Sequence, residues 1–83
     1  MPKWNEFLPS EIEYDFENDK LHRHHVTIEE VAQCFYNRYT VRKNKKYQDR
    51  FKLIGTSDSG RSLCVIFQLK DSEVVRVITG WEV

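Results

Sequence analysis

The sequence predicts a single α+β domain in which two N-terminal helices pack on one face of an antiparallel sheet. Three observations lead to this fold class. A length of 83 residues suits one domain. Apolar residues follow a helical spacing up to about residue 36 and alternate with a period of two after it. Helices that precede a run of strands must cover one face of the sheet, which gives two layers.

The N-terminal third is expected to contain an arm, a short strand and a first helix. Residues 1–11 have little pattern and predict an extended arm, which leaves residues 12–83 as the domain. Residues 12–14 alternate and predict a short edge strand. Asp15 is expected to cap a first helix that runs to about His24.

A second helix is predicted over residues 27–36. Thr27 and Glu30 have the spacing of a capping box, in which each side chain satisfies the free backbone N–H of the other residue. Val26 and Val31 occupy the positions of a hydrophobic staple. The spacing i, i+3, i+4, i+7 predicts one buried face, formed by Ile28, Val31, Ala32 and Phe35.

Four strands are predicted after this helix, over residues 39–42, 47–55, 61–69 and 74–79. A basic loop over residues 43–46 joins the first two, and Asp58-Ser59-Gly60 forms a turn with glycine where a positive φ is accessible. Alternation divides the side chains between two faces. The face toward the helices is expected to carry Phe51, Leu53, Val65, Phe67, Val75 and Val77, and the other face Arg50, Lys52 and Arg76.

The charges are unevenly distributed although the formal net charge is zero. Residues 37–52 contain seven bases and one acid, whereas residues 1–36 contain eight acids and three bases. Such a basic patch can attract a polyanion or an acidic protein. Cys34 and Cys64 lack metal-ligand spacing and are expected to be reduced, buried thiols. No signal peptide and no membrane-spanning stretch is expected, which favours the cytoplasm.

Several segments, in the same order and at similar spacing, resemble the BrnT toxins of bacterial type II toxin–antitoxin systems. The resemblance covers about residues 12–80 and lies in Ile12–Asp15, Arg23–Val31, Arg50–Ser57, Gly60–Phe67 and Val75–Thr79. It implies a RelE-like fold and a ribonuclease toxin that inhibits translation by RNA cleavage. It also implies a cognate antitoxin that neutralises the toxin in a hetero-oligomer. His25 stands where the family usually has glycine, and Gly80-Trp81-Glu82-Val83 stands where the family usually has a basic segment.

RNA cleavage without a metal needs groups that move protons and cations that stabilise the phosphate. On this hypothesis His24, Arg61 and Arg76 are the catalytic candidates, and no metal or cofactor is expected. The candidates for RNA binding are Arg50, Lys52, Lys45, Lys46 and Tyr47.

Structural alternatives stand beside these roles. His24 can simply cap the end of a helix, a basic loop can be only a solvated turn, and exposed cations can only keep a sheet soluble. Trp4 and Trp81 are interpreted as packing or interface anchors. The alternative function is a non-enzymatic protein- or nucleic-acid-binding module on the same fold, and a degraded toxin that retains only antitoxin binding lies between the two.

Overall fold

The computed structural model describes residues 8–44, 46, 49–70 and 73–83. One α-helix and one short 3₁₀ helix occur in this part of the chain, together with a single sheet. In chain order the elements are β1 (Glu11–Tyr14), η1 (His22–His24), α1 (Ile28–Tyr36), β2 (Tyr39–Lys43), β3 (Arg50–Thr56), β4 (Ser62–Leu69) and β5 (Val74–Glu82).

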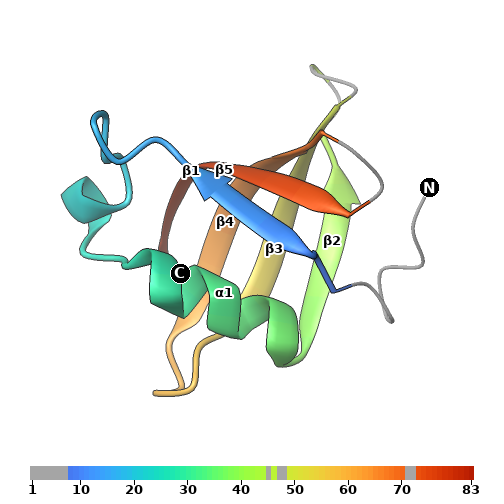
Figure 1. Cartoon of the computed structure of the whole chain (residues 1–83). Coiled ribbons are helices and arrows are strands. Elements are labelled where there is room, and N and C mark those ends of the chain that lie inside the picture. Colours follow the sequence, from blue (N-terminus) through green and yellow to red (C-terminus); the bar gives the residue numbers. More distant parts are fainter. Residues whose placement is uncertain (1–7, 45, 47–48, 71–72) are drawn as a thin grey trace.

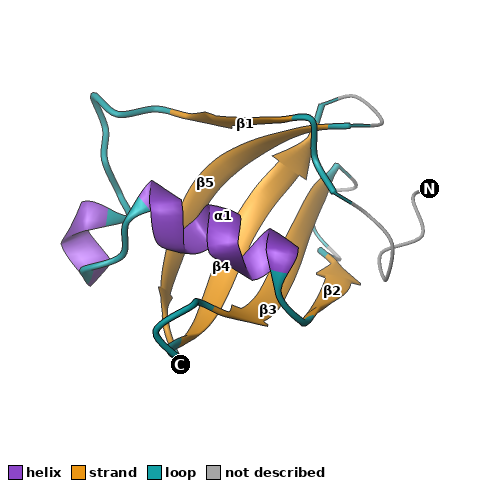
Figure 2. Ribbon diagram, turned by 60° about the horizontal axis from the view of Figure 1, so that its bottom comes forward, coloured by secondary structure: helices purple, strands orange, loops and turns teal. Residues whose placement is uncertain are grey.

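The five strands form a mixed sheet in the order β1-β5-β4-β3-β2. Strands β2 to β5 form an antiparallel meander, while β1 pairs with β5 in parallel. The helix α1 lies across one face of this sheet, and no second α-helix covers the opposite face in the described residues (Figures 1 and 2). We refer to that opposite face as the open face.

The predicted fold class is therefore wrong in two respects. The described residues contain one α-helix rather than two, and the parallel pairing of β1 makes the sheet mixed rather than antiparallel. The segment expected to be the first helix, residues 15–24, consists of turns and the three-residue helix η1, and we call it the turn segment. One helix on a mixed sheet also differs from the two helices on an antiparallel sheet that were expected for a RelE-like fold.

Side chains in or next to this segment accept hydrogen bonds from several of its backbone N–H groups. The Asp15 carboxylate accepts from the N–H of Glu17, and the Asp19 carboxylate accepts from the N–H of His22. The hydroxyl of Tyr14 accepts from the N–H of Leu21 at 2.8 Å and itself donates to Asp19. Aspartate competes with helical hydrogen bonds in this way, so the segment closes into turns.

The helix α1 confirms the predicted capping box. The Thr27 hydroxyl accepts from the N–H of Glu30 at 3.2 Å, and the Glu30 carboxylate accepts from the N–H of Thr27 at 3.1 Å. Val26 and Val31, the predicted staple residues, are both buried in the core.

The core lies between α1 and the sheet. Phe67 is at its centre, stacked on Phe51 and edge-on to Phe35, with ring centroids 5.6 Å apart in both pairs. The predicted inward-facing strand residues are all buried there. Leu21 from the turn segment is also buried and closes the core beside Gly80, where an added Cβ would approach the Leu21 side chain to 3.1 Å.

The last strand is longer than predicted and contains an irregularity. It runs to Glu82, and its pairing with β4 shifts between Ile66 and Phe67, so that Ile78 is an extra residue on β5. Such a bulge resets the alternation of faces. As a result Trp81 pairs with Cys64 on the open face, whereas simple alternation from Val75 and Val77 would turn it toward the helix.

Of the predicted arm, residues 1–7 with Trp4 lie outside the described residues, and Glu11 already begins β1. The predicted turn at Gly60 is confirmed, with φ at 89°. In the part of the chain that the structure describes, no helix has the length and apolar character needed to cross a membrane.

Candidate functional site

The open face is a set of cross-strand rows that follow from the sheet register. One row joins Arg42, Lys52, Ile66 and Thr79 across β2 to β5. The next joins Arg50, Gln68, Arg76 and Glu13 across β3, β4, β5 and β1. We call these two the cationic rows. A third row, at the other end of the face, contains Thr40, Ile54, Cys64 and Trp81, and we call it the apolar row.

Two acidic side chains on or beside the cationic rows interact with other residues. Glu13 pairs with Lys70 at 3.1 Å, and the Asp49 carboxylate accepts from the Gln68 amide at 2.6 Å. Arg42, Lys52 and Arg76 are exposed. The rows therefore present cations to solvent, and the charge of Glu13 is compensated by Lys70.

A polar cavity of about 290 Å³ lies at the edge of the cationic rows, where β1 ends and the turn segment begins. Arg50, Gln68 and Arg76 contribute from the sheet, and Asp15 and Lys20 contribute from the turn segment. The rest of its lining is Tyr14, Asn18, Val77 and Ile78. Three cations and one carboxylate thus surround one small polar volume, which suits a phosphate group.

The turn segment is held beside this cavity by Tyr14. Its hydroxyl bonds to both Asp19 and Leu21, and Leu21 is anchored in the core. Burial, followed by the hydrogen bond to Asp19, raises the pKa of Tyr14. The same hydrogen bond, with the one from the His22 N–H, lowers the pKa of Asp19. These hydrogen bonds hold the backbone on both sides of Lys20, whose side chain takes no part in them.

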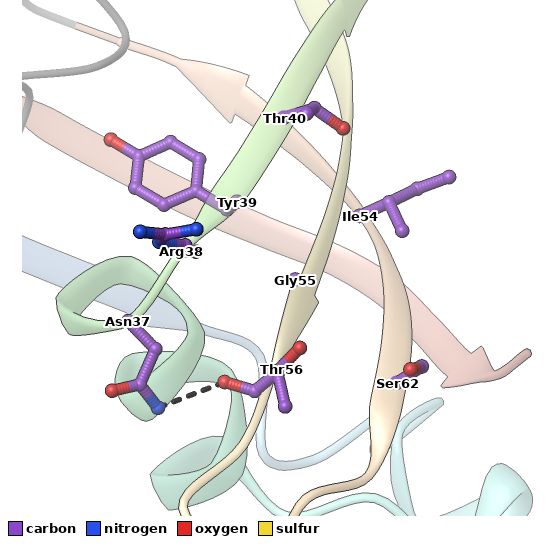
Figure 3. Close-up of a pocket in the computed structure, with 8 residues that line it drawn as sticks. All are labelled: Asn37, Arg38, Tyr39, Thr40, Ile54, Gly55, Thr56 and Ser62. Carbon is purple, nitrogen blue, oxygen red and sulfur yellow. Dashed lines mark hydrogen bonds between the residues drawn. The ribbon is translucent and has the colours of Figure 1, made fainter.

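A second, shallower concavity of about 500 Å³ lies at the β2 and β3 end of the apolar row. Its polar groups include the hydroxyls of Thr40, Thr56 and Ser62, while Ile54 contributes apolar surface (Figure 3). The Asn37 amide is committed to the Thr56 carbonyl at 2.9 Å and to Asp58 at 3.0 Å. Arg38, Tyr39 and Gly55 complete the lining.

The predicted catalytic residues do not come together. Arg76 lines the polar cavity, but His24 lies beside Trp81 with ring centroids 6.2 Å apart. Trp81 pairs with Cys64 and Arg76 with Gln68, so the two positions are four residues apart along β4, about 13 Å at strand spacing.

Arg61 lies on the helix side of the sheet, away from the open face. Its guanidinium contacts Glu30 at 2.8 Å, Glu82 at 3.3 Å and the carbonyl of His25 at 3.0 Å. The hydrogen bond to Glu30, opposed by some burial, raises the pKa of Arg61. Arg61 therefore ties the start of α1 to the end of β5 and to the turn after η1, which is a structural role.

Among the predicted binding residues, Arg50 and Lys52 lie on the cationic rows with Arg76. Lys46 is exposed in the turn between β2 and β3, while Lys45 and Tyr47 lie outside the described residues. The sequence interpretation missed Lys20, which the turn segment brings to the cavity, and it missed the position of Trp81 on the open face. The acidic segment that contains Lys20 is visible in the sequence, but the hydrogen bonds that join it to Tyr14 are not.

The two cysteines are free and buried, as the sequence predicts. Burial raises the pKa of Cys34 to about 11, which keeps its thiol protonated at neutral pH. Among the described residues, no group of three histidine, cysteine, aspartate or glutamate side chains is placed to hold a metal ion.

The fold and this site define a small α+β protein with a cationic sheet face that no α-helix of the described residues covers. No protein family, curated protein or solved structure matches the chain.

Proposed function

We propose that this chain is a ribonuclease toxin that holds RNA against the open face of its sheet and is neutralised by a cognate antitoxin. The observation that carries the proposal is the grouping of Lys20, Arg50 and Arg76 around one polar cavity. Arginine binds two phosphate oxygens at once through its planar fork, and lysine adds a mobile point charge. A toxin acting on RNA in this way would work in the cytoplasm.

The cavity contains the kinds of group that metal-independent RNA cleavage requires. Asp15 can take the proton of the RNA 2′-hydroxyl as its oxygen attacks the adjacent phosphorus. Arg50 and Arg76 can stabilise the extra charge on the phosphate, and Lys20 can give a proton to the departing 5′-oxygen. The products would be a 2′,3′-cyclic phosphate and a 5′-hydroxyl end.

The resemblance to BrnT toxins supplies the toxin and antitoxin part of the proposal, and one structural detail supports it. His25, which stands where that family usually has glycine, has a φ of 58°. This left-handed conformation is one that glycine adopts without strain. The same backbone turn would explain a glycine in the family and a strained histidine in this chain.

The catalytic assignment changes accordingly. Arg76 keeps the role that the sequence suggested, but Arg61 is committed to Glu30 and Glu82 and His24 lies at the far end of the face. We therefore assign charge stabilisation to Arg50 and Arg76, and proton transfer to Asp15 and Lys20.

A second candidate function is RNA binding without cleavage. It is favoured by the separation of His24, Arg61 and Arg76, since the three residues that the sequence suggested for catalysis do not meet at one phosphate. Cations on exposed strands bind nucleic acid backbones without any chemistry, through a sequence-independent and salt-sensitive interaction.

The test is cleavage of a labelled single-stranded RNA by the purified chain in the presence of EDTA. Arg76→Gln should slow cleavage by about 100-fold, as loss of a charge-stabilising donor typically does. Lys43→Gln is the matched control, because Lys43 is an exposed cation whose register partner, Phe51, is in the core rather than on the open face. Its rate should stay within about twofold of the parent rate, the margin of a remote surface charge.

Expression in a bacterial host separates the two candidates. The toxin proposal expects growth arrest with fragmented RNA, and rescue by Arg76→Gln or by a co-expressed antitoxin. RNA that is bound but stays intact, with normal growth, would replace the toxin by the binding module. Absence of both binding and cleavage would overturn both candidates.

A further inference from the structure

The apolar row places hydrophobic surface directly beside the cationic rows. Ile54 is 41% exposed, although most large apolar side chains of the strands are in the core. It pairs with Cys64, which in turn pairs with Trp81. Cys64 is only 2% exposed, so its larger neighbours on this row form the surface there. Ile54 also lines the concavity of about 500 Å³ at the β2 end of the row (Figure 3).

Trp81 is partly exposed at the β5 end of this row and has an aromatic neighbour. The rings of His24 and Trp81 lie 6.2 Å apart at an interplanar angle of 56°. They are tilted rather than stacked face to face on each other. A partly exposed indole on a sheet is the kind of platform on which an unpaired base stacks.

The adjacent cationic row provides the phosphate contacts that such a ligand needs. Arg42 and Lys52 lie two residues along their strands from Thr40 and Ile54, which is about 7 Å at strand spacing. Burial raises the pKa of the Cys64 thiol, and the nearby charge of Lys52 partly opposes this effect. The cations and the apolar row therefore form one continuous surface.

We propose that Trp81 and Ile54 form a base-stacking subsite for single-stranded RNA, with Arg42 and Lys52 on the phosphates that lead from it to the cavity at Arg76. This inference rests on the proposed function, because it takes RNA as the ligand. It adds that the strand must be unpaired, and that it runs across the face between the cavity and Trp81. The distance of about 13 Å between these two positions leaves room for several nucleotides.

The charge pattern favours RNA over a protein on this surface. An apolar protein partner would have to remove water from Arg42, Lys52 and Arg76 as well as from Ile54, and buried unpaired charges are costly. A nucleic acid strand supplies bases for the apolar row and phosphates for the cations. A duplex would supply only phosphates, because its bases are stacked inside the helix.

The experiment measures the affinity of the full chain for a fluorescein-labelled RNA of about eight nucleotides by anisotropy, with the same sequence in a duplex for comparison. Trp81→Leu should weaken binding of the single strand by about 10-fold, since one base stack contributes about 1–3 kcal/mol. Tyr36→Leu is the matched control, because Tyr36 is an aromatic residue that is 72% exposed on α1, in the other layer.

Two further measurements guard against misfolding of the Trp81 variant. Ile54→Thr keeps a β-branched residue in the exposed position and should also weaken single-strand binding. In a Trp4→Phe background, single-stranded RNA should quench the fluorescence of Trp81. The duplex should bind more weakly than the single strand and should not quench it.

The outcomes distinguish this inference from the function on which it rests. If Arg76→Gln weakens binding but Trp81→Leu and Ile54→Thr do not, RNA binds the cations without stacking on the apolar row, and only this inference fails. Equal affinity for single strand and duplex would overturn it in the same way. If the parent chain binds no RNA, the proposed function fails together with it.

Discussion

At the scale of single residues, His25 shows how one backbone angle can be tested. With φ at 58° and ψ at 39°, it is the one described residue other than glycine with a positive φ. This conformation costs a residue with a side chain about 1–2 kcal/mol. His25→Gly should therefore raise the free energy of unfolding by about 0.5–1 kcal/mol, since glycine also gains entropy in the unfolded chain.

Urea denaturation measures this effect. His24→Gly is the matched control, because His24 belongs to η1 and has a negative φ. It should lower stability instead. A drop in stability for His25→Gly as large as that for His24→Gly would contradict the assignment of backbone strain to His25.

Arg61 and Arg76 give opposite predictions because their surroundings differ. Arg61 joins Glu30, Glu82 and the His25 carbonyl, so Arg61→Gln should lower the melting temperature and the loss should shrink in high salt, which screens the 27%-exposed guanidinium. The RNA affinity of this variant should be unchanged while the chain is folded. Arg76→Gln should instead weaken RNA binding and leave the melting temperature unchanged.

Thermal melting, RNA anisotropy and the RNA cleavage assay on the same two variants check this pair. Unchanged stability in Arg61→Gln, together with loss of RNA cleavage, would restore Arg61 to the catalytic site that the sequence suggested.

At the scale of elements, the conformation of the turn segment between β1 and α1 depends on the side chains of Tyr14 and Asp19. Hydrogen bonds from Tyr14 and from the His22 N–H lower the pKa of Asp19 below 3.8, its ordinary value. A carboxylate with a lowered folded pKa adds stability that is present above its unfolded pKa and is lost as the pH falls through the folded one. Asp19→Asn should therefore be less stable than the parent near pH 7.

The stability gap between the two proteins should narrow once the pH falls below 3.8. Thermal melts from pH 7 to about pH 2.5 measure it. Glu17→Gln removes a charge from the same segment without touching these hydrogen bonds, and should show no such narrowing. A constant gap for Asp19→Asn would mean that the carboxylate charge does not hold the segment.

The elements that were predicted correctly are those whose signals are local. The capping box of Thr27 and Glu30 lies within four residues, and the alternation over Phe51, Leu53, Val65 and Phe67 is continuous. These signals do not depend on the rest of the fold. They were enough to predict α1, the meander and the grouping of Arg50, Lys52 and Arg76.

The features that were missed depend on contacts distant in sequence or on a change of register. The first helix was predicted wrongly because Tyr14 and the aspartates compete for its N–H groups. Lys20 reaches the cavity only because that segment forms turns. Trp81 reaches the open face only because the extra residue Ile78 shifts the pairing of β5, and a bulge has no unique sequence signal.

At the scale of the whole molecule, the proposed function depends on the separation of a covered and an open face, which gathers cations on one side of a chain with no net charge. Arg42 and Lys43 are adjacent on β2 but pair with Lys52 and Phe51, so they belong to opposite faces. Arg42→Gln should weaken RNA binding several-fold and reduce the salt slope by about 0.7, the value for one phosphate contact to a single strand. Lys43→Gln should do neither.

Affinity measured from about 50 to 200 mM salt checks both variants. Equal effects of the two substitutions would indicate that the β2 end attracts RNA as a diffuse basic patch, without a preferred face.

The most direct test of the open face as the RNA surface uses the isoleucine methyl groups, which NMR resolves after selective labelling. The chain has five isoleucines. Ile54 and Ile66 lie on the open face and Ile78 lines the polar cavity, whereas Ile12 and Ile28 pack against the core. Addition of a single-stranded RNA should shift the methyl signals of Ile54, Ile66 and Ile78 and leave those of Ile12 and Ile28 in place. Shifts confined to Ile12 and Ile28, or no shifts at saturating RNA, would contradict the account.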